Sequence, residues 1–383
     1  MATKRSIFEE VGEKEAAAAA PSPGLIDQAG RAGARKAIRL WLIVLFGLVV
    51  VMIQVGGLTR LTDSGLSITE WAPISGAIPP LSADAWDAEF EKYKAIPEYE
   101  LQNKGMSLAE FKVIYWWEWG HRQLGRVIGL VWALGFLAFL LARKIPTGWT
   151  GRLAFLGVLG GIQGAIGWWM VASGLTGEAL DVASYRLATH LGLAFLILGF
   201  IAWYVLHMGR AERELMQARR VREADHMTGA GVFLGLAFVQ ILLGALVAGI
   251  DAGRTYVDWP LMAGGFLPPD PLDLQPIWRN FFEDDGLVQF MHRIAGYLLL
   301  VVGLFVCWRG RRSAHKRTQR AFEWAGVVLF GQVVIGIVTV MNSAPWHLAI
   351  FHQLLAVILW VLILRARFLA AYPIVGSVRE GRT

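Results

Sequence analysis

Long apolar segments separated by short polar ones dominate the pattern of this chain. Eight runs of roughly 20 residues carry few charges, and a run of this length spans the hydrocarbon core of a bilayer as a helix. The pattern predicts an all-α integral membrane protein with eight transmembrane helices. The runs cover about residues 38–58, 116–141, 152–172, 186–207, 229–249, 287–308, 322–341 and 347–369.

The polar segments alternate in charge, which predicts how the helices are oriented. Lysine and arginine are concentrated before the first run and after every even-numbered run. Because cytoplasmic segments carry an excess of these residues, we expect both termini in the cytoplasm. Two long loops, about residues 62–115 and 251–286, then lie outside. In the first loop, Ser82 is a candidate helix N-cap, and Ser107 with Glu110 fits a capping box.

Composition supports a single membrane body. The chain is 55% hydrophobic and 17% charged, whereas a soluble domain carries roughly 25% charged residues. The net charge of +6 comes from basic residues at helix ends, which argues against a nucleic-acid partner. Cys307 is the single cysteine, so no intrachain disulfide can form.

An internal repeat relates the two halves of the chain. Asp63-Ser64-Gly65 recurs as Asp251-Ala252-Gly253, and the pair Gln163 and Gly167 recurs as Gln332 and Gly336. The repeat predicts two pseudo-symmetric four-helix bundles. We expect a disordered cytoplasmic tail (1–35), an N-terminal bundle (36–208), a cytoplasmic linker (209–228), a C-terminal bundle (229–371) and a second cytoplasmic tail (372–383).

Four histidines form a candidate ligand set: His121, His190, His292 and His352. Each lies near the outer end of an even-numbered run, and a glycine or alanine follows four residues later on the same helix face. A lone membrane histidine can simply hydrogen-bond a neighbouring helix. Four at matched depth, paired by the repeat, favour a bound metal centre. Zinc prefers tight tetrahedral clusters, so two imidazoles on separate helices favour bis-histidine haem.

Arginines near the outer ends of the helices are candidate partners of haem propionates, because a guanidinium binds a carboxylate in a fork. Interfacial anchoring is the alternative role. The candidates are Arg60, Arg122, Arg126, Arg186, Arg254 and Arg293.

The chain resembles the haem A synthase family. The matching stretches are residues 56–71, 118–122, 170–175, 186–191, 290–293 and 352–353, and they are spread over most of the chain beyond the N-terminal tail. The resemblance implies an oxidoreductase acting on CH groups in the bacterial inner membrane. Its reaction would convert the C8 methyl group of haem O to a formyl group by two hydroxylations and loss of water. Some bacterial members carry a cysteine pair in an outer loop, and this chain has none there.

One position separates the two halves and suggests where the chemistry happens. Glu118 precedes His121 by three residues, whereas Gln289 precedes His292 by three. A carboxylate can relay protons, and an amide mainly hydrogen-bonds. We therefore expect haem O between His121 and His190, with Glu118 as the catalytic residue. An interfacial ion pair of Glu118 with Arg122 or Arg126 is the alternative.

The family implies further partners. Haem b is expected as a cofactor on His292 and His352, and an external donor supplies electrons. Haem O synthase and oxidase assembly factors are candidate partners, and a second copy of the same chain, forming a homo-oligomer, is another candidate.

Two other functions compete with the enzyme. The first is a bis-histidine di-haem electron-transfer cytochrome. One histidine per helix would place two haems side by side near the outer face, an arrangement that does not carry electrons across the bilayer. The second is a transporter, which the repeat alone would suggest but which leaves the histidine set unexplained.

Overall fold

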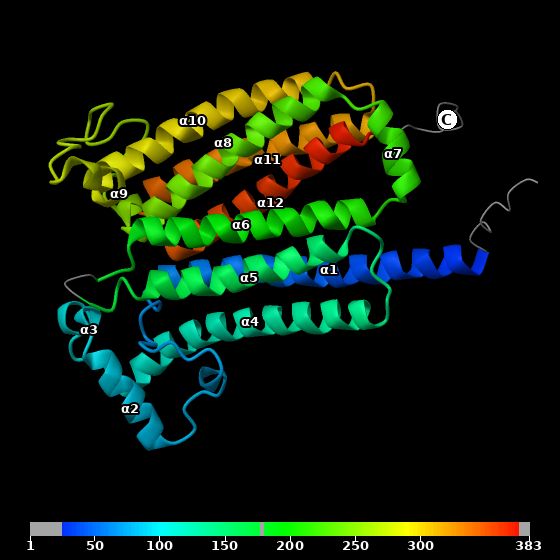
Figure 1. The fold of residues 1–383 in the computed structure, drawn as a ribbon. Helices are drawn as coiled ribbons and strands as arrows, with labels where there is room; N and C mark the ends of the chain where they lie inside the picture. Colours follow the sequence, from blue (N-terminus) through cyan, green and yellow to red (C-terminus); the bar gives the residue numbers. More distant parts are fainter. Residues whose placement is uncertain (1–24, 177–179, 375–383) are drawn as a thin grey trace, which may run out of the picture.

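The computed structural model describes residues 25–176 and 180–374, and these ranges contain helices and loops but no strand. The long helices lie side by side, with α2, α3 and α9 at one end and α7 at the other (Figure 1). The elements are α1 (Leu25–Leu61), η1 (Ser75–Ala77), α2 (Ala83–Lys94), α3 (Pro97–Leu101), α4 (Leu108–Leu141), α5 (Thr150–Val171), α6 (Ser184–Met208), α7 (Glu212–Arg220), α8 (Ala224–Gly249), η2 (Ala252–Arg254), η3 (Ile277–Arg279), α9 (Asn280–Glu283), α10 (Asp285–Gly310), α11 (Lys316–Met341) and α12 (Trp346–Ala371).

Eight of the described helices are long and apolar enough to cross a membrane, which confirms the predicted fold class. They are α1, α4, α5, α6, α8, α10, α11 and α12. On α4, Leu130, Leu134, Leu137 and Leu141 are all exposed at the spacing of one helix face. A row of exposed leucines is stable where lipid, rather than water, covers it.

Local sequence explains where several helices begin. Ser82 caps α2 by accepting from the Ala85 amide. At the start of α4, Ser107 and Glu110 form the predicted capping box. The ends of α1 and α8 also match, because Asp63 and Asp251 both adopt a left-handed conformation, with φ of 47° and 54°. The same turn after the first helix of each half supports the internal repeat at the level of the backbone.

Within each half the spanning helices pack on one another, and further helix contacts join the two halves. In the first half, α1 packs on α4 and α6, and α5 packs on α4 and α6; in the second half, α8 packs on α10 and α12, and α11 packs on the same two helices. The halves meet mainly where α6 contacts α8 and α12. There the Trp360 indole donates to the Phe195 carbonyl at 3.0 Å. These contacts are compatible with two four-helix bundles, and that division stays a prediction.

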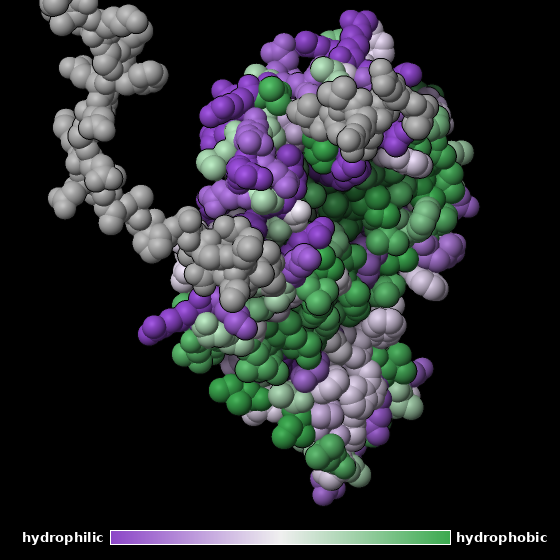
Figure 2. Space-filling view, turned by 90° about the vertical axis from the view of Figure 1, so that its right-hand side faces the viewer, coloured by the Kyte–Doolittle hydropathy of each residue, from purple (hydrophilic) through white to green (hydrophobic). Residues whose placement is uncertain are grey.

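The domain boundaries differ in detail from the expected ones. Helix α1 begins at Leu25, inside the expected tail, whose residues 1–24 lie outside the described ranges, as do residues 375–383. The expected linker contains the amphipathic helix α7, which the sequence pattern did not predict. Figure 2 shows the end of the molecule at α7, where hydrophilic residues lie beside a broad hydrophobic area.

Candidate functional site

The four candidate histidines share one local geometry, each facing a glycine on the preceding spanning helix. A Cβ atom built on that glycine would lie 2.8–3.1 Å from the imidazole Cε1, closer than side chains pack. Glycine is therefore required for the ring to lie this close to the neighbouring backbone. The pairs are His121 with Gly56, His190 with Gly167, His292 with Gly244 and His352 with Gly336.

Three of the histidines are also held by a glutamine one helical turn before the facing glycine. The glutamine Nε2 donates to the histidine backbone carbonyl at 3.0–3.1 Å and lies 3.1–3.4 Å from a ring nitrogen. These contacts fix the imidazole relative to the adjacent helix. The glutamines are Gln163 for His190, Gln240 for His292 and Gln332 for His352.

The fourth position, beside His121, carries Met52 instead. Met52 lies four residues before Gly56, as each glutamine precedes its glycine. A Cβ on Gly125 would lie 3.3 Å from the Met52 Cε, and one on Gly296 would lie 3.2 Å from the Gln240 Nε2. The small residue four places after these two histidines therefore makes room for the neighbouring side chain. Its predicted role as clearance for a macrocycle stays a prediction.

Unpaired polar atoms surround these imidazoles. Among the described residues, the Oε1 atoms of all three glutamines and the Nδ1 atoms of His121 and His352 are buried without a hydrogen-bond partner. Buried polar groups are nearly always satisfied, so orphans repeated at equivalent positions indicate a site for a bound group. In the described ranges, no three His, Cys, Asp or Glu side chains come close enough to hold a bare metal ion. Spaced imidazoles with these orphans fit haem better than a metal cluster.

Glu118, in the N-terminal part of α4, is buried, and both of its carboxylate oxygens accept hydrogen bonds. Its Oε2 accepts from the Ser67 hydroxyl and from the Ile68 amide, both at 2.7 Å. Its Oε1 accepts from the Arg122 guanidinium at 2.7 and 3.0 Å. The alternative ion pair with Arg122 is thus present, and Glu118 fastens the loop after α1 to the helix that carries His121.

Gln289 occupies the equivalent place in the second half with opposite polarity. Its Nε2 donates to the carbonyls of Ala252 and Tyr256 at 2.8 and 3.1 Å. Its Oε1 accepts from Arg293 at 3.0 Å. Both halves therefore use the residue three before a histidine to hold an outer loop. Only the first half does so with an ionisable group.

The outer-face arginines bind parts of the protein itself. Arg122 and Arg293 donate to outer-loop carbonyls, as does Arg126 to Pro73 and Ala72 at 2.9 Å, and Arg186 donates to the Trp169 carbonyl at 2.7 Å. Three of them keep a buried Nε–H without a partner in the described part of the chain. Spare donors of this kind are compatible with a further carboxylate, so propionate binding stays a prediction. The three are Arg60, Arg186 and Arg293.

Arg60 lies where the halves meet. It forms ion pairs with Asp63 and Asp251 at 2.9 Å and with Asp181 at 3.3 Å. Burial raises the pKa of the Asp181 carboxyl, although Arg60 opposes the shift. Arg254 makes a looser pair with Asp251 at 3.7 Å. Arg60 therefore joins both Asp-x-Gly turns, a role that the sequence analysis missed.

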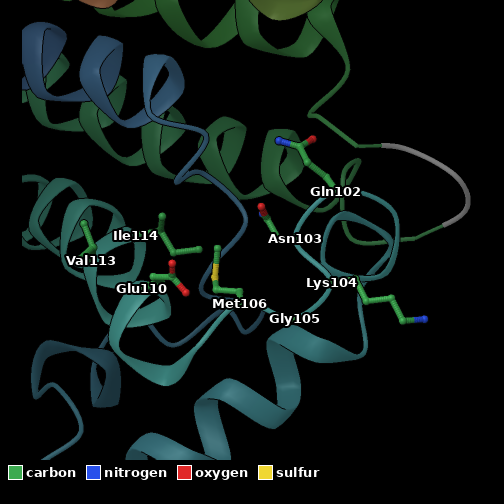
Figure 3. Close-up of a pocket in the computed structure, with 8 residues that line it drawn as sticks. All are labelled: Gln102, Asn103, Lys104, Gly105, Met106, Glu110, Val113 and Ile114. Atoms are coloured by element: carbon green, nitrogen blue, oxygen red, sulfur yellow. The ribbon is translucent and has the colours of Figure 1, made fainter.

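The segment between α1 and α4 contains a second buried carboxylate, that of Glu98, and an open cavity. Burial raises the pKa of Glu98, on α3, to about 8. The cavity, of about 550 Å³, lies between the end of α3 and the start of α4 and is lined by Met106 and Glu110 among others (Figure 3). None of the four histidines lines it. It is therefore separate from the histidine sites.

The histidines and Glu118 could be found from sequence, but their partners could not. The glycines and glutamines on the facing helices were visible as a recurring Gln-x-x-x-Gly spacing on α5, α8 and α11. In the sequence, the pairs on α5 and α11 indicate the internal repeat, but which helix each glutamine faces depends on the helix packing.

Comparisons with known proteins agree with this architecture. The family model described as "Cytochrome oxidase assembly protein" matches residues 39–364. Proteins named "Heme A synthase" are 73% identical over 379 residues in Dinoroseobacter shibae, covering 99% of each chain, and 69% identical over 381 residues in Ruegeria pomeroyi, covering 99% of this chain and 100% of the relative. A third, from Roseobacter denitrificans, is 64% identical over 381 residues. The chain therefore belongs to the haem A synthase family.

Proposed function

We propose that this protein is a haem A synthase, an oxidoreductase that converts the C8 methyl group of haem O to a formyl group by successive hydroxylations. The observation that carries the proposal is the set of four histidine–glycine contacts, two in each half. The strong similarity to heme A synthases along the whole chain supports it. The competing di-haem cytochrome would use the same histidines but gives no reason for the acid at position 118.

Haem O binds between His121 and His190, and haem b is held by His292 and His352. Each pair comes from the second and fourth spanning helices of one half, α4 with α6 and α10 with α12. Haem b supplies a redox-active iron when bound, and an external donor supplies its electrons. The spare Nε–H donors of Arg186 and Arg293 are suited to propionate carboxylates.

Glu118 is the proposed catalytic residue. It lies one helical turn from His121, with Arg122 and Ser67 holding its two oxygens. These bonds fix the carboxylate in one orientation. Ser67 can reorient its hydroxyl, so Oε2 is the atom that can take up or release a proton. An amide at this position would keep the loop contacts in part but could not handle a proton.

We propose that the protein lies in the bacterial inner membrane with both termini in the cytoplasm. The basic segments and the common location of α7 and both described chain ends support this orientation (Figure 1). Haem O synthase and oxidase assembly factors are candidate partners for delivery of substrate and removal of product.

Expression in a host that makes haem O but no haem A tests the activity. We expect chromatography of the extracted haems to show haem A only when this protein is present. A variant with His121 and His190 both replaced by alanine controls for conversion by the host. Haem b with bis-histidine spectra but without haem A would favour the electron-transfer cytochrome instead.

A further inference from the structure

Met52 breaks the fourfold pattern around the histidines. At the equivalent position of the other three sites, a glutamine ties the histidine backbone and ring to the neighbouring helix. We propose that Met52 is a positioning residue that leaves His121 loosely held, so that haem exchanges on the His121 side of the substrate site. This inference rests on the proposed function, because it assumes that His121 and His190 hold the substrate haem.

The chemistry of the two side chains explains the difference. A carboxamide offers two N–H donors and an acceptor, whereas a thioether offers only a weak acceptor on a flexible chain. Within the described ranges the Nδ1 atoms of His121 and His352 are both buried without a hydrogen-bond partner, but only His352 is also held through its backbone carbonyl by a glutamine. The glutamine Nε2 donates to the histidine backbone carbonyl and fixes the ring orientation, and loss of contacts that orient a ligating histidine typically weakens metal binding by roughly 10–100-fold. His121 is therefore expected to be the weakest of the four iron ligands.

The helix that carries His121 is also the least enclosed of the ligand helices. Phe111, Tyr115 and Glu118 of α4 are buried, but no residue of this helix beyond His121 is. By contrast, the most apolar 18-residue window of α6, which carries His190, is 50% buried. Helix α4 packs on α1 and α5, whereas α6 packs on helices of both halves. Haem O and haem A have a largely apolar macrocycle besides their propionate carboxylates, and a lipid-facing route suits the apolar part. His121 thus lies on a ligand helix that packs mainly on two other spanning helices and can move toward lipid.

The second half provides the contrast within the same molecule. His292, which corresponds to His121, is tied to α8 by Gln240 through both its carbonyl and its ring. Haem b is a retained cofactor in the proposed function, so a firm ligand is appropriate there. One residue on the helix before each ligand helix thus separates an exchanging site from a retaining one.

The test exchanges these two residues in the full-length protein, purified in detergent from cells that make haem O and haem b. Haem release is followed by transfer to excess apomyoglobin, and the haem type is identified by chromatography. We expect Met52→Gln to slow release of haem O roughly tenfold. The reverse change, Gln240→Met, should speed release of haem b by a similar roughly tenfold factor. Met52→Leu should leave both release rates as they are.

The outcomes separate this inference from the proposed function. Unchanged haem O release in Met52→Gln overturns the inference, and if that variant does not fold, unchanged haem b release in Gln240→Met does so. An altered iron spectrum in Met52→Leu would also overturn it, because Met52 sulfur would then be a direct ligand. Wild-type protein with neither haem O nor haem A, by contrast, would contradict the proposed function itself.

Discussion

The two halves of the molecule hold their outer loops with the same geometry and opposite hydrogen-bond polarity. In the first half, Glu118 accepts hydrogen bonds from the loop after α1. In the second, Gln289 donates to the loop after α8. An amide could not reproduce the first contact, because both oxygens of Glu118 accept hydrogen bonds and an amide NH2 would face either Arg122 or the Ile68 amide. The carboxylate is therefore needed for anchoring in the first half, and a catalytic role one turn from His121 stays a prediction that must be tested separately.

Replacing the carboxylate should produce the largest effect. We expect Glu118→Gln to reduce haem A formation by roughly 100-fold or more, because general acid–base groups contribute at least that much. Haem O should still bind. Gln289→Met removes the corresponding polar group of the second half and should change the yield far less. The measurement is haem A formed per mole of folded protein.

A purely anchoring role for Glu118 has its own signature. Ser67→Ala removes one of the bonds to Glu118 but keeps the carboxylate. If Glu118 only anchors the loop, Ser67→Ala and Glu118→Gln should both lose stability and activity in parallel. Near-normal haem A output from Glu118→Gln would end the case for catalysis and for placing the substrate in the first half.

The glycines that face the histidines allow the halves to be tested separately. A Cβ at Gly244 would lie 3.1 Å from the His292 ring, and one at Gly56 would lie 2.8 Å from that of His121. Gly244→Ala should lower the haem b content and Gly56→Ala the haem O content, each by roughly tenfold, as expected for a displaced metal ligand. Visible spectra and haem chromatography of purified protein measure both.

Matched controls lie on the same two helices. Gly235 on α8 and Gly47 on α1 have open space where a Cβ would be added. Alanine at either position should leave the haem content unchanged. If Gly244→Ala also retains haem b at the wild-type level, the histidine on α10 is not a ligand in the orientation described.

Hydrophobic runs and capping residues in the sequence predicted the helices, but they did not predict which helices contact one another. Long apolar runs gave the eight spanning helices, and Ser82 and Ser107 gave two correct helix starts. The partners of Arg60 and of the histidines depend on which helices pack together and in what register. Neither is encoded in local periodicity. The helix α7 was missed because its charged residues mask a short apolar face formed by Leu215 and Ala218.

Arg60 tests how strongly the halves depend on each other. Arg60→Gln leaves Asp63, Asp181 and Asp251 without their shared cation. Removing one partner of a buried pair costs about 3–5 kcal/mol. Because the aspartates are 35–41% exposed, solvent screening reduces the expected loss to roughly 1–3 kcal/mol. Thermal unfolding in detergent should show a lower apparent melting temperature, and Arg254→Gln, at a looser and more exposed pair, should show little change. Equal melting of both variants and wild type would mean that Arg60 does not join the halves.

The last prediction concerns Glu98, a buried acid on α3, between α1 and α4. Burial raises its pKa from the ordinary value of 4.5 to about 8. Between these values the folded chain holds a proton that the unfolded chain has released, so stability should fall as the pH rises from 4.5 to 8 and level off above. Glu98→Gln should remove most of this slope, so the stability of the variant relative to wild type should rise as the pH increases from about 5 to 8. Glu100→Gln, on the exposed side of the same helix, should keep the wild-type slope. Apparent melting temperatures across pH 5–9 measure the three profiles, and a Glu98→Gln profile parallel to wild type would show that this carboxyl does not titrate in that range.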